Sequence, residues 1–138
     1  MRGLGGVSLI PSAGIDVPLV LSGMQKIQQH RGPDSQGQWW NECRGVGLCH
    51  NRLAILDLSP AGAQPMHSAD GRFVIVFNGE LYNYRELREQ LKTKGATFHS
   101  ESDTEVLLEA YRSWGEDMLP LLRGMFAFTL YDSQEDIM

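Results

Sequence analysis

Three features are missing from this sequence, and each absence excludes a class of protein. No apolar run approaches the roughly 20 residues that span a bilayer, and the apolar stretch near the start is interrupted by Pro11 and Asp16, which argues against a signal peptide. No dense basic run exists either: 12 Lys and Arg are scattered among 17 acidic residues, for a net charge of −5. Nucleic-acid binders normally carry a basic patch. We therefore expect a cytoplasmic protein without nucleic-acid or membrane partners.

Cysteine, metal-ligand and phosphate-loop motifs are also scarce. The only two cysteines, Cys43 and Cys49, form neither a disulfide framework nor a paired zinc motif. Two free thiols are the expectation, with a hairpin cystine between them as the alternative. The four histidines (30, 50, 67 and 99) lack metal-ligand spacing, and no glycine-rich phosphate loop is present. We expect no metal and no cofactor in this chain.

The residues that are present describe one globular domain. The chain has 138 residues, 42% hydrophobic and 21% charged, which is enough for a real core. Hydrophobic periodicity and turn residues predict helices that follow Asp16, Asn83 and Ser102 and strands at 36–40, 45–56, 72–78 and 125–131. This mixed order favours an α+β sandwich of antiparallel sheets with helices packed outside.

The predicted helices carry recognisable end signals. Asp16 is the expected N-cap of the first helix, with Pro18 in its first turn. Asn83 with Glu86, and Ser102 with Glu105, have the spacing of capping boxes. Glycines 95 and 115 are expected to end these two helices.

The first candidate site is the stretch FNGELYNY, where Asn78, Gly79 and Glu80 follow a buried strand. A side-chain amide beside a glycine N–H is a pairing that holds a developing oxyanion. The alternative is that Asn78 and Gly79 only turn the chain toward the next helix.

Two charged residues complete the candidate site. In a strand through HNRLAIL, Arg52 shares a face with Leu48 and His50 and can grip a carboxylate with two hydrogen bonds. An exposed cross-strand charge is the alternative. Asp103 follows a helix cap, where the helix dipole alone favours a carboxylate. Together, an Arg, an Asp and an Asn-Gly pair form a receptor for a free amino acid.

Six ordered motifs now point to a family. They are HRGPDSQGQW (30–39), HNRLAILDL (50–58), GAQPM (62–66), FNGELYNYRELREQL (77–91), ESDTEVLL (101–108) and LRGMFAFTLYD (122–132). In these motifs the chain resembles the N-terminal glutaminase domain of glutamine-dependent asparagine synthetases, a class II glutamine amidotransferase. It is also similar to amidotransferases encoded with polysaccharide-synthesis genes. The resemblance extends over residues 1–138.

The resemblance implies a fold and a role for each candidate residue. The fold would be that of the N-terminal-nucleophile hydrolases, a four-layer sandwich of two antiparallel sheets between helix layers. Arg52 would bind the α-carboxylate of L-glutamine, and Asp103 with the backbone at Glu80 would bind its α-amino group. Asn78 and Gly79 would form the oxyanion hole. The loop 30–34 would lie near the N-terminus.

Position 2 departs from the pattern. In the family the chain begins Met-Cys-Gly, Met1 is removed, and the freed cysteine attacks the glutamine side-chain amide with its own α-amino group as base. This sequence has Arg2, whose guanidinium carries only donors and has no lone pair for attack. Losing the nucleophile of a catalytic unit costs on the order of 10⁴ to 10⁶ in rate. We expect no glutamine hydrolysis by this chain.

The family pattern continues beyond residue 138. Family members have further strands of the sandwich and an ATP-using synthetase domain, so we expect an incomplete sandwich here, with ATP and Mg²⁺ belonging only to that other domain. Three interpretations follow. The chain is the glutaminase part of an asparagine synthetase-type protein supplying ammonia for amide formation on aspartate, a catalytically dead glutamine-binding or subunit-interaction module, or a gene product without function.

Overall fold

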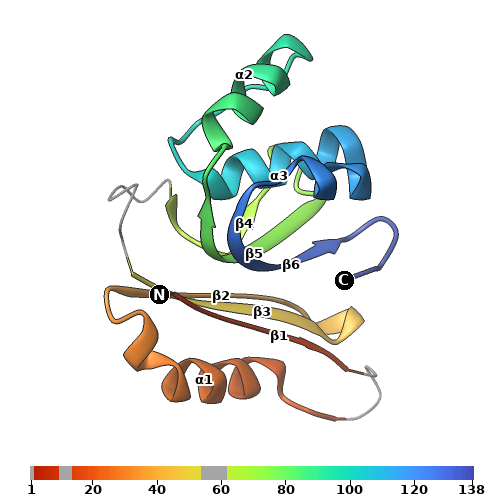
Figure 1. Cartoon of the computed structure of the whole chain (residues 1–138). Coiled ribbons are helices and arrows are strands. Elements are labelled where there is room, and N and C mark those ends of the chain that lie inside the picture. Colours follow the sequence, from red (N-terminus) through yellow and green to blue (C-terminus); the bar gives the residue numbers. More distant parts are fainter. Residues whose placement is uncertain (1, 10–13, 54–61) are drawn as a thin grey trace.

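A computed structural model describes residues 2–9, 14–53 and 62–138, which contain both helices and strands (Figure 1). In chain order they are β1 (Gly3–Ser8), α1 (Val17–Ile27), β2 (Ser35–Asn41), β3 (Val46–Arg52), β4 (Met66–His67), β5 (Phe73–Leu81), α2 (Tyr84–Thr93), α3 (Asp103–Trp114) and β6 (Gly124–Asp132). Short 3₁₀ segments lie at Gln29–Arg31, Glu42–Arg44 and Gly115–Leu121.

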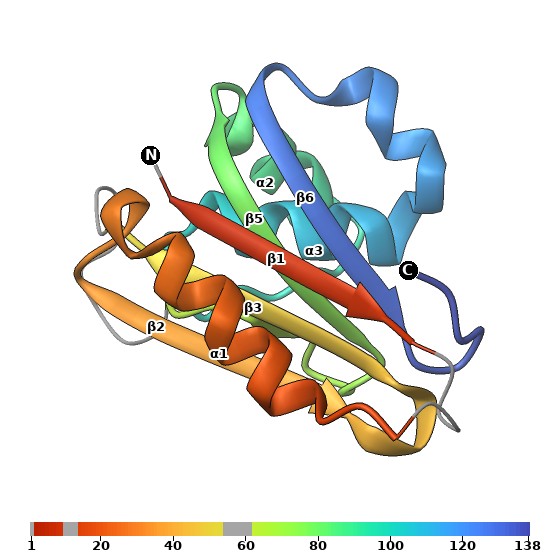
Figure 2. The same cartoon turned by 90° about the horizontal axis from the view of Figure 1, so that it is seen from below.

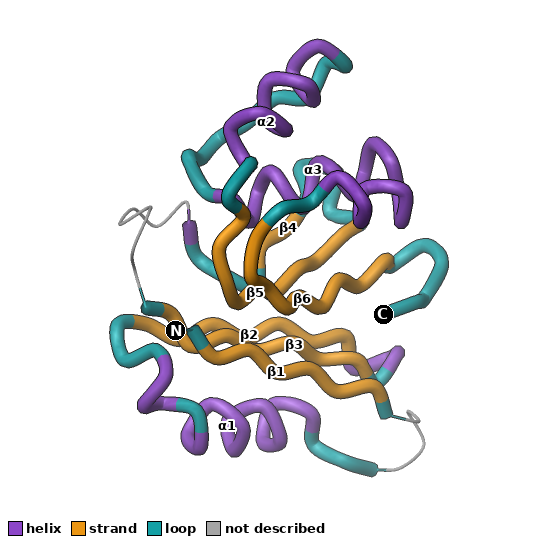
Figure 3. The backbone as a smooth tube through the Cα atoms, viewed as in Figure 1, coloured by secondary structure: helices purple, strands orange, loops and turns teal. Residues whose placement is uncertain are grey.

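The elements form four layers, which confirms the predicted α+β sandwich. Sheet A has the strand order β1-β3-β2 and sheet B the order β4-β5-β6, and all described pairs are antiparallel. Helix α1 covers the outer face of sheet A, while α3 lies on the outer face of sheet B and α2 rises away from it (Figures 1 and 3). The inner faces of the two sheets pack against each other.

Sheet A packs against α1 through small residues. Strand β1 was not expected, because three of its six residues are glycine. Its register against β3 pairs Gly3 with Asn51, and a Cβ on Gly3 would lie 2.6 Å from Oε1 of Gln28, at the end of α1. Glycine therefore lets Gln28, at the end of α1, approach the strand closely, and Figure 2 shows the end of α1 beside the start of β1.

The largest core lies between sheet B and its two helices. The odd-numbered residues of β5 face this core, as the run of five apolar residues allows. Its members are Phe73, Ile75, Phe77, Leu81, Leu87, Leu91, Val106, Leu107, Leu108, Ala110, Met118 and Leu130. The even-numbered residues Val74 and Val76 face sheet A instead and meet Val46 and Leu48 of β3. Strand β5 is therefore covered on both faces.

The helix starts lie where the sequence predicts, but two capping boxes are wrong. Asp16 does cap α1, by accepting a hydrogen bond from the N–H of Leu19 at 2.9 Å. The side chain of Asn83 instead donates to the Leu121 carbonyl (2.9 Å) and accepts from the Arg123 N–H (3.0 Å). Tertiary contacts thus replace the local bond, because Asn83 faces the segment that leads into β6.

In the second predicted box, only the cap itself is confirmed. The Ser102 hydroxyl accepts from the Thr104 N–H at 3.1 Å. Glu105 does not reach back to Ser102: its carboxylate accepts hydrogen bonds from the backbone of His99 and Ser100, each at 2.8 Å, and from the Ser100 hydroxyl. Glu105 therefore fixes the loop ahead of α3.

The observed strand boundaries differ from the predicted ones in β3 and β5, the two strands that carry candidate site residues. Strand β3 ends at Arg52, Leu53 follows outside the strand, and positions 54–56 of the predicted strand lie outside the described residues. Strand β5 continues three residues beyond the predicted end, to Leu81. Both cysteines are free, Cys43 exposed and Cys49 buried against α1, so the hairpin cystine is not formed.

No helix in the described part of the chain is long and apolar enough to cross a membrane.

Candidate active site

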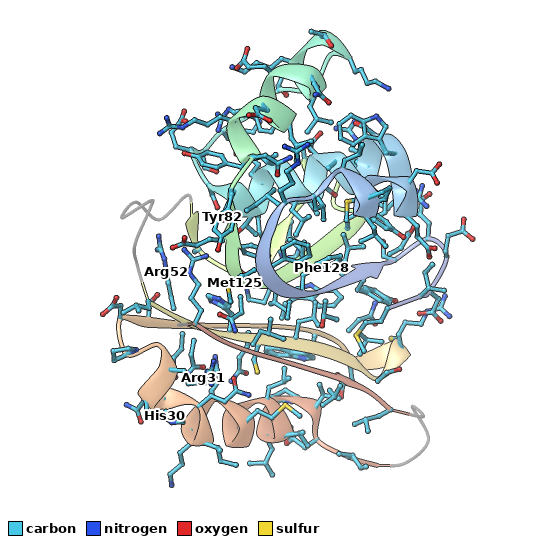
Figure 4. All side chains as sticks on the ribbon, in the orientation of Figure 1. His30, Arg31, Arg52, Tyr82, Met125 and Phe128 are labelled. Carbon is cyan, nitrogen blue, oxygen red and sulfur yellow. The ribbon has the colours of Figure 1, made fainter. Side chains whose placement is uncertain are left out.

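The ends of three strands meet at one end of the sandwich. Strand β1 begins beside the end of β3, because Gly3 pairs with Asn51. Alternation along β3 places His50 and Arg52 on the same side as Val46 and Leu48, the side that packs on sheet B. Figure 4 shows Arg52 at the level between the two sheets.

Asn78 joins sheet B to this end of sheet A. It lies on the inner face of β5, in alternation with Val74 and Val76. Its Oδ1 accepts a hydrogen bond from the backbone N–H of Arg2 at 3.1 Å. This bond fixes the side chain so that the Nδ2 donor, which has no partner among the described residues, is available to an oxyanion.

Gly79 belongs to the strand and does not turn the chain. It pairs with Phe126 of β6 while its φ is 145°. A Cβ at this position would lie 2.2 Å from the Met125 carbonyl oxygen, so only glycine fits. The turn alternative for Asn78 and Gly79 is wrong, because the ladder continues through both residues.

Asp103 is a buried carboxylate with one unused oxygen. It is 1% exposed, at the first position of α3. Oδ2 accepts from the Leu81 N–H at 3.2 Å, whereas Oδ1 has no hydrogen-bond partner among the described residues. Burial raises the pKa of Asp103, and the Leu81 amide and the positive charge of Arg2 oppose that rise. A buried acceptor without a donor indicates a place for a ligand's donor.

Arg2 lies inside this arrangement and is only 9% exposed. Its Nε donates to the Leu53 carbonyl at 3.3 Å, and its own carbonyl accepts from Nε of Arg31 at 3.3 Å. Burial lowers the pKa of Arg2, the negative charges of Asp103 and Glu80 raise it, and Arg52 lowers it further. The guanidinium therefore lies within electrostatic reach of the predicted site residues, although the Glu80 side chain itself is exposed.

The loop 30–34 lies next to the N-terminus, as the resemblance implied, because Arg31 bonds to Arg2. Besides the Arg31 bond to Arg2, the Asp34 N–H donates to the Arg52 carbonyl at 3.0 Å. A Cβ on Gly32 would lie 2.3 Å from the Asn51 carbonyl oxygen. His30 is exposed, and its Nδ1 lies 3.1 Å from the Ile27 carbonyl, so it belongs to the end of α1.

Sequence reasoning assigned no role to His50. It is 1% exposed, and neither ring nitrogen makes a hydrogen bond of normal geometry with a described residue. Burial, then the nearby charge of Arg2 and to a lesser degree that of Arg52, lowers the pKa of His50 to about 4, against an opposing influence of the Phe77 backbone. The imidazole is therefore neutral at pH 7 and adds no charge to the site.

Gln64 is a second residue without a predicted role. Its Oε1 accepts from the Phe77 N–H at 2.6 Å, and its Nε2 donates to the Thr104 hydroxyl at 3.0 Å. One buried side chain thus links the residue before Asn78 with the residue after Asp103. The motif GAQPM was the available signal, but nothing in its composition indicates where the glutamine side chain points.

The described residues include no cluster of three or more His, Cys, Asp or Glu side chains that could hold a metal ion. The charged and hydrogen-bonding groups of this end of the sandwich are guanidiniums, a carboxylate and amides, with the neutral imidazole of His50 beside them. These groups recognise the carboxylate, the ammonium and the side-chain carbonyl of an amino acid by hydrogen bonding.

Comparison with known proteins identifies the family of the chain. The family described as "Glutamine amidotransferase domain" matches residues 1–138. This chain shares its fold with a solved glutamine phosphoribosylpyrophosphate amidotransferase from B. subtilis, with a TM-score of 0.67 and 20% sequence identity. The match covers 95% of this chain and 34% of the other one. The chain belongs to the glutamine amidotransferase domain family.

The curated relatives of this chain include several asparagine synthetases. The chain is 46% identical over 115 residues to asparagine synthetase [glutamine-hydrolyzing] 1 of Bacillus subtilis, with 83% of this chain and 18% of the relative covered. It is 41% identical over 128 residues to a putative asparagine synthetase of Mycobacterium tuberculosis (87% and 20% covered). For asparagine synthetase B of Escherichia coli the identity is 40% over 113 residues (82% and 20%). The chain spans about one fifth of these relatives' length.

Proposed function

We propose that this domain binds a free α-amino acid of the glutamine type, with Arg52 on the α-carboxylate and Asp103, assisted by the Glu80 backbone, on the α-ammonium group. Asn78 and Gly79 take the side-chain carbonyl. With Arg2 in place of the nucleophile, the domain binds its ligand without hydrolysing it.

The unpartnered Oδ1 of Asp103 carries this proposal. A buried acceptor that lacks a donor is destabilising unless something supplies one. An α-ammonium group has three donors and a positive charge, which is what a desolvated carboxylate with a raised pKa requires. The position of Arg52 at the adjacent strand end, bonded to the loop 30–34, suits the other end of the same zwitterion.

The absence of catalysis rests on the chemistry of position 2. The backbone N–H of Arg2 lies at the oxyanion amide, 3.1 Å from Asn78, so the side chain that leaves this point is the one expected to meet the reacting carbonyl. A guanidinium cannot attack it. The remaining cysteines do not replace it, because Cys43 is exposed and Cys49 faces α1.

We further propose the setting in which such a domain works. The relatives' names indicate glutamine hydrolysis coupled to asparagine synthesis, so a synthetase domain or subunit that uses ATP and Mg²⁺ is the proposed partner, and aspartate or a sugar precursor the acceptor. In that setting the ligand is L-glutamine, and a domain with cysteine at position 2 supplies ammonia. A cytoplasmic location is part of the same proposal.

Titration calorimetry of the chain with L-glutamine and L-glutamate tests binding. We expect saturable binding of at least one of the two, abolished by Arg52→Met and by Asp103→Asn. The exposed residues Arg123 and Asp117 provide matched controls, because Arg123→Met and Asp117→Asn remove the same charges elsewhere. Absence of binding by both amino acids would refute the proposal.

Ammonia release tests the second half. The chain should release none from glutamine, whereas Arg2→Cys, after removal of Met1, should release it. Release by the unchanged chain would overturn the role assigned to Arg2.

A further inference from the structure

The main chain of Arg2 is fixed on both sides at the candidate site. Its N–H donates to Asn78 Oδ1 at 3.1 Å, and its carbonyl accepts from Arg31 Nε at 3.3 Å. The two hydrogen bonds go to different elements, β5 and the 3₁₀ segment Gln29–Arg31, and they hold the backbone at this end of the sandwich. The residue is accordingly buried, with 9% exposure.

The guanidinium of Arg2 is held at one nitrogen only. Nε donates to the Leu53 carbonyl, and neither Nη atom makes a hydrogen bond or an ion pair within 4.0 Å with residues 2–9, 14–53 or 62–138. The negative charges of Asp103 and Glu80 favour the charged form of the Arg2 guanidinium through space, and the positive charge of Arg52 disfavours it. A cation with two unused donor nitrogens therefore lies beside the amino-acid site.

This cation changes which ligand the site fits. Glutamine and glutamate have the same shape and differ only where glutamine carries a neutral –NH₂ and glutamate an anionic oxygen. The –NH₂ group and a guanidinium are both donors, whereas a carboxylate accepts two parallel bonds from a guanidinium. One added pair of opposite charges in a partly buried site therefore favours the anionic ligand.

We propose that the site selects L-glutamate over L-glutamine, with the side-chain carboxylate of the ligand paired with Arg2. The proposal rests on the amino-acid site described above and adds the ligand's charge. Arg52 and Asp103 then hold the α-carboxylate and the α-ammonium group, and Arg2 replaces the nucleophile as the recognition element for the far end of the ligand. His50 is neutral at pH 7, so Arg2 and not His50 supplies the positive charge for that carboxylate.

Calorimetry on the full chain at pH 7 compares the two amino acids directly. We expect glutamate to bind at least tenfold more tightly than glutamine, with an affinity that falls as salt is added. Arg2→Met removes the charge at similar size and should abolish the preference while glutamine binding persists. Lys26→Met, which removes an exposed charge from α1, should leave the preference unchanged.

The outcomes separate this inference from the proposal on which it rests. Equal or tighter binding of glutamine by the unchanged chain overturns the glutamate preference and leaves the amino-acid site standing. Glutamine binding by Arg2→Met together with no binding by the unchanged chain also overturns it, because Arg2 then blocks the site. No binding by either protein refutes the site itself.

Discussion

At the scale of single residues, the end of the sandwich that carries the candidate site holds ionisable groups whose charged forms are disfavoured by burial. Asp103 and His50 are each 1% exposed, and desolvation is the main influence on the pKa of both. Groups that cost stability in this way are typical of binding sites, where a ligand later compensates the cost. Their effect on stability is therefore a direct measure of that cost.

Replacing Asp103 should stabilise the empty chain. Because the folded pKa is raised, the folded state binds a proton more readily than the unfolded state, and stability declines as the pH rises past the ordinary carboxyl range. Asp103→Asn keeps an acceptor for the Leu81 N–H and removes the buried charge, so its thermal midpoint should exceed that of the unchanged chain at pH 7. The difference should vanish at low pH. Thermal unfolding between pH 3 and 8 measures this, with the exposed Asp117→Asn as control.

His50 should make stability depend on pH in the opposite direction. Its pKa is lowered from 6.5 to about 4, so the unfolded chain takes up a proton first and stability is lost as the pH falls from 6.5 through 4. The shift corresponds to about 3 kcal/mol at its limit. His50→Gln should flatten denaturant-midpoint profiles over this range, and the exposed His30→Gln should not. An unchanged profile for His50→Gln would contradict the assignment.

Sequence reasoning named the candidate site residues but not those that position them. Arg52, Asn78, Gly79 and Asp103 carry groups whose chemistry suggests a ligand, and the structure brings them to one end of the sandwich. Gln64 acts through two hydrogen bonds to residues 13 and 40 positions away, Phe77 and Thr104. No local pattern encodes such a link, because it depends on how a loop packs.

At the scale of elements, the pairing of β5 with β6 requires glycine at position 79 of β5. Gly79 combines a positive φ with a cross-strand carbonyl that leaves no room for a Cβ, and it sits between two proposed ligand contacts. The strand therefore keeps its ladder while its backbone orientation changes at the site.

Gly79→Ala should destabilise the chain by more than about 3 kcal/mol, through backbone strain and a steric clash together. Gly71→Ala is the matched control: its φ is 72°, but a Cβ there has nothing within 4 Å. It should cost only about 1 kcal/mol from the left-handed conformation. Denaturant unfolding measures both values. Similar losses at the two positions would show that the close approach to Met125 is relieved by movement of β6.

The element boundaries show where local signals succeed. Asp16 and Ser102 cap their helices as predicted, because each needs only a backbone N–H within its own first turn. Asn83 and Glu105 had the right spacing for reciprocal bonds but faced partners from other segments. Strand β1 was not predicted, because glycine is unusual in strands. Its glycines allow close packing against Met24 and Gln28 of the α1 region, and the composition of the strand alone does not indicate this contact.

At the scale of the whole molecule, the two cysteines differ in their exposure to solvent. Cys43 is exposed, whereas Cys49 is buried under α1, where desolvation raises its pKa to about 11. At pH 8 an aromatic disulfide reagent should modify one thiol per chain rapidly. The second should react only as fast as α1 separates from sheet A. Cys49→Ala should retain the fast phase alone, and two fast thiols in the unchanged chain would contradict the packing.

Each sheet is built from one continuous half of the chain. Sheet A and α1 use residues up to 52, and sheet B with α2 and α3 uses residues from 66 onward. During synthesis from the N-terminus, the first half, with Arg2 and Arg52, thus emerges before Asn78 and Asp103 are made. The proposed amino-acid site therefore needs both halves, and a ligand added during translation should act on the docking of the halves and not on the folding of either one.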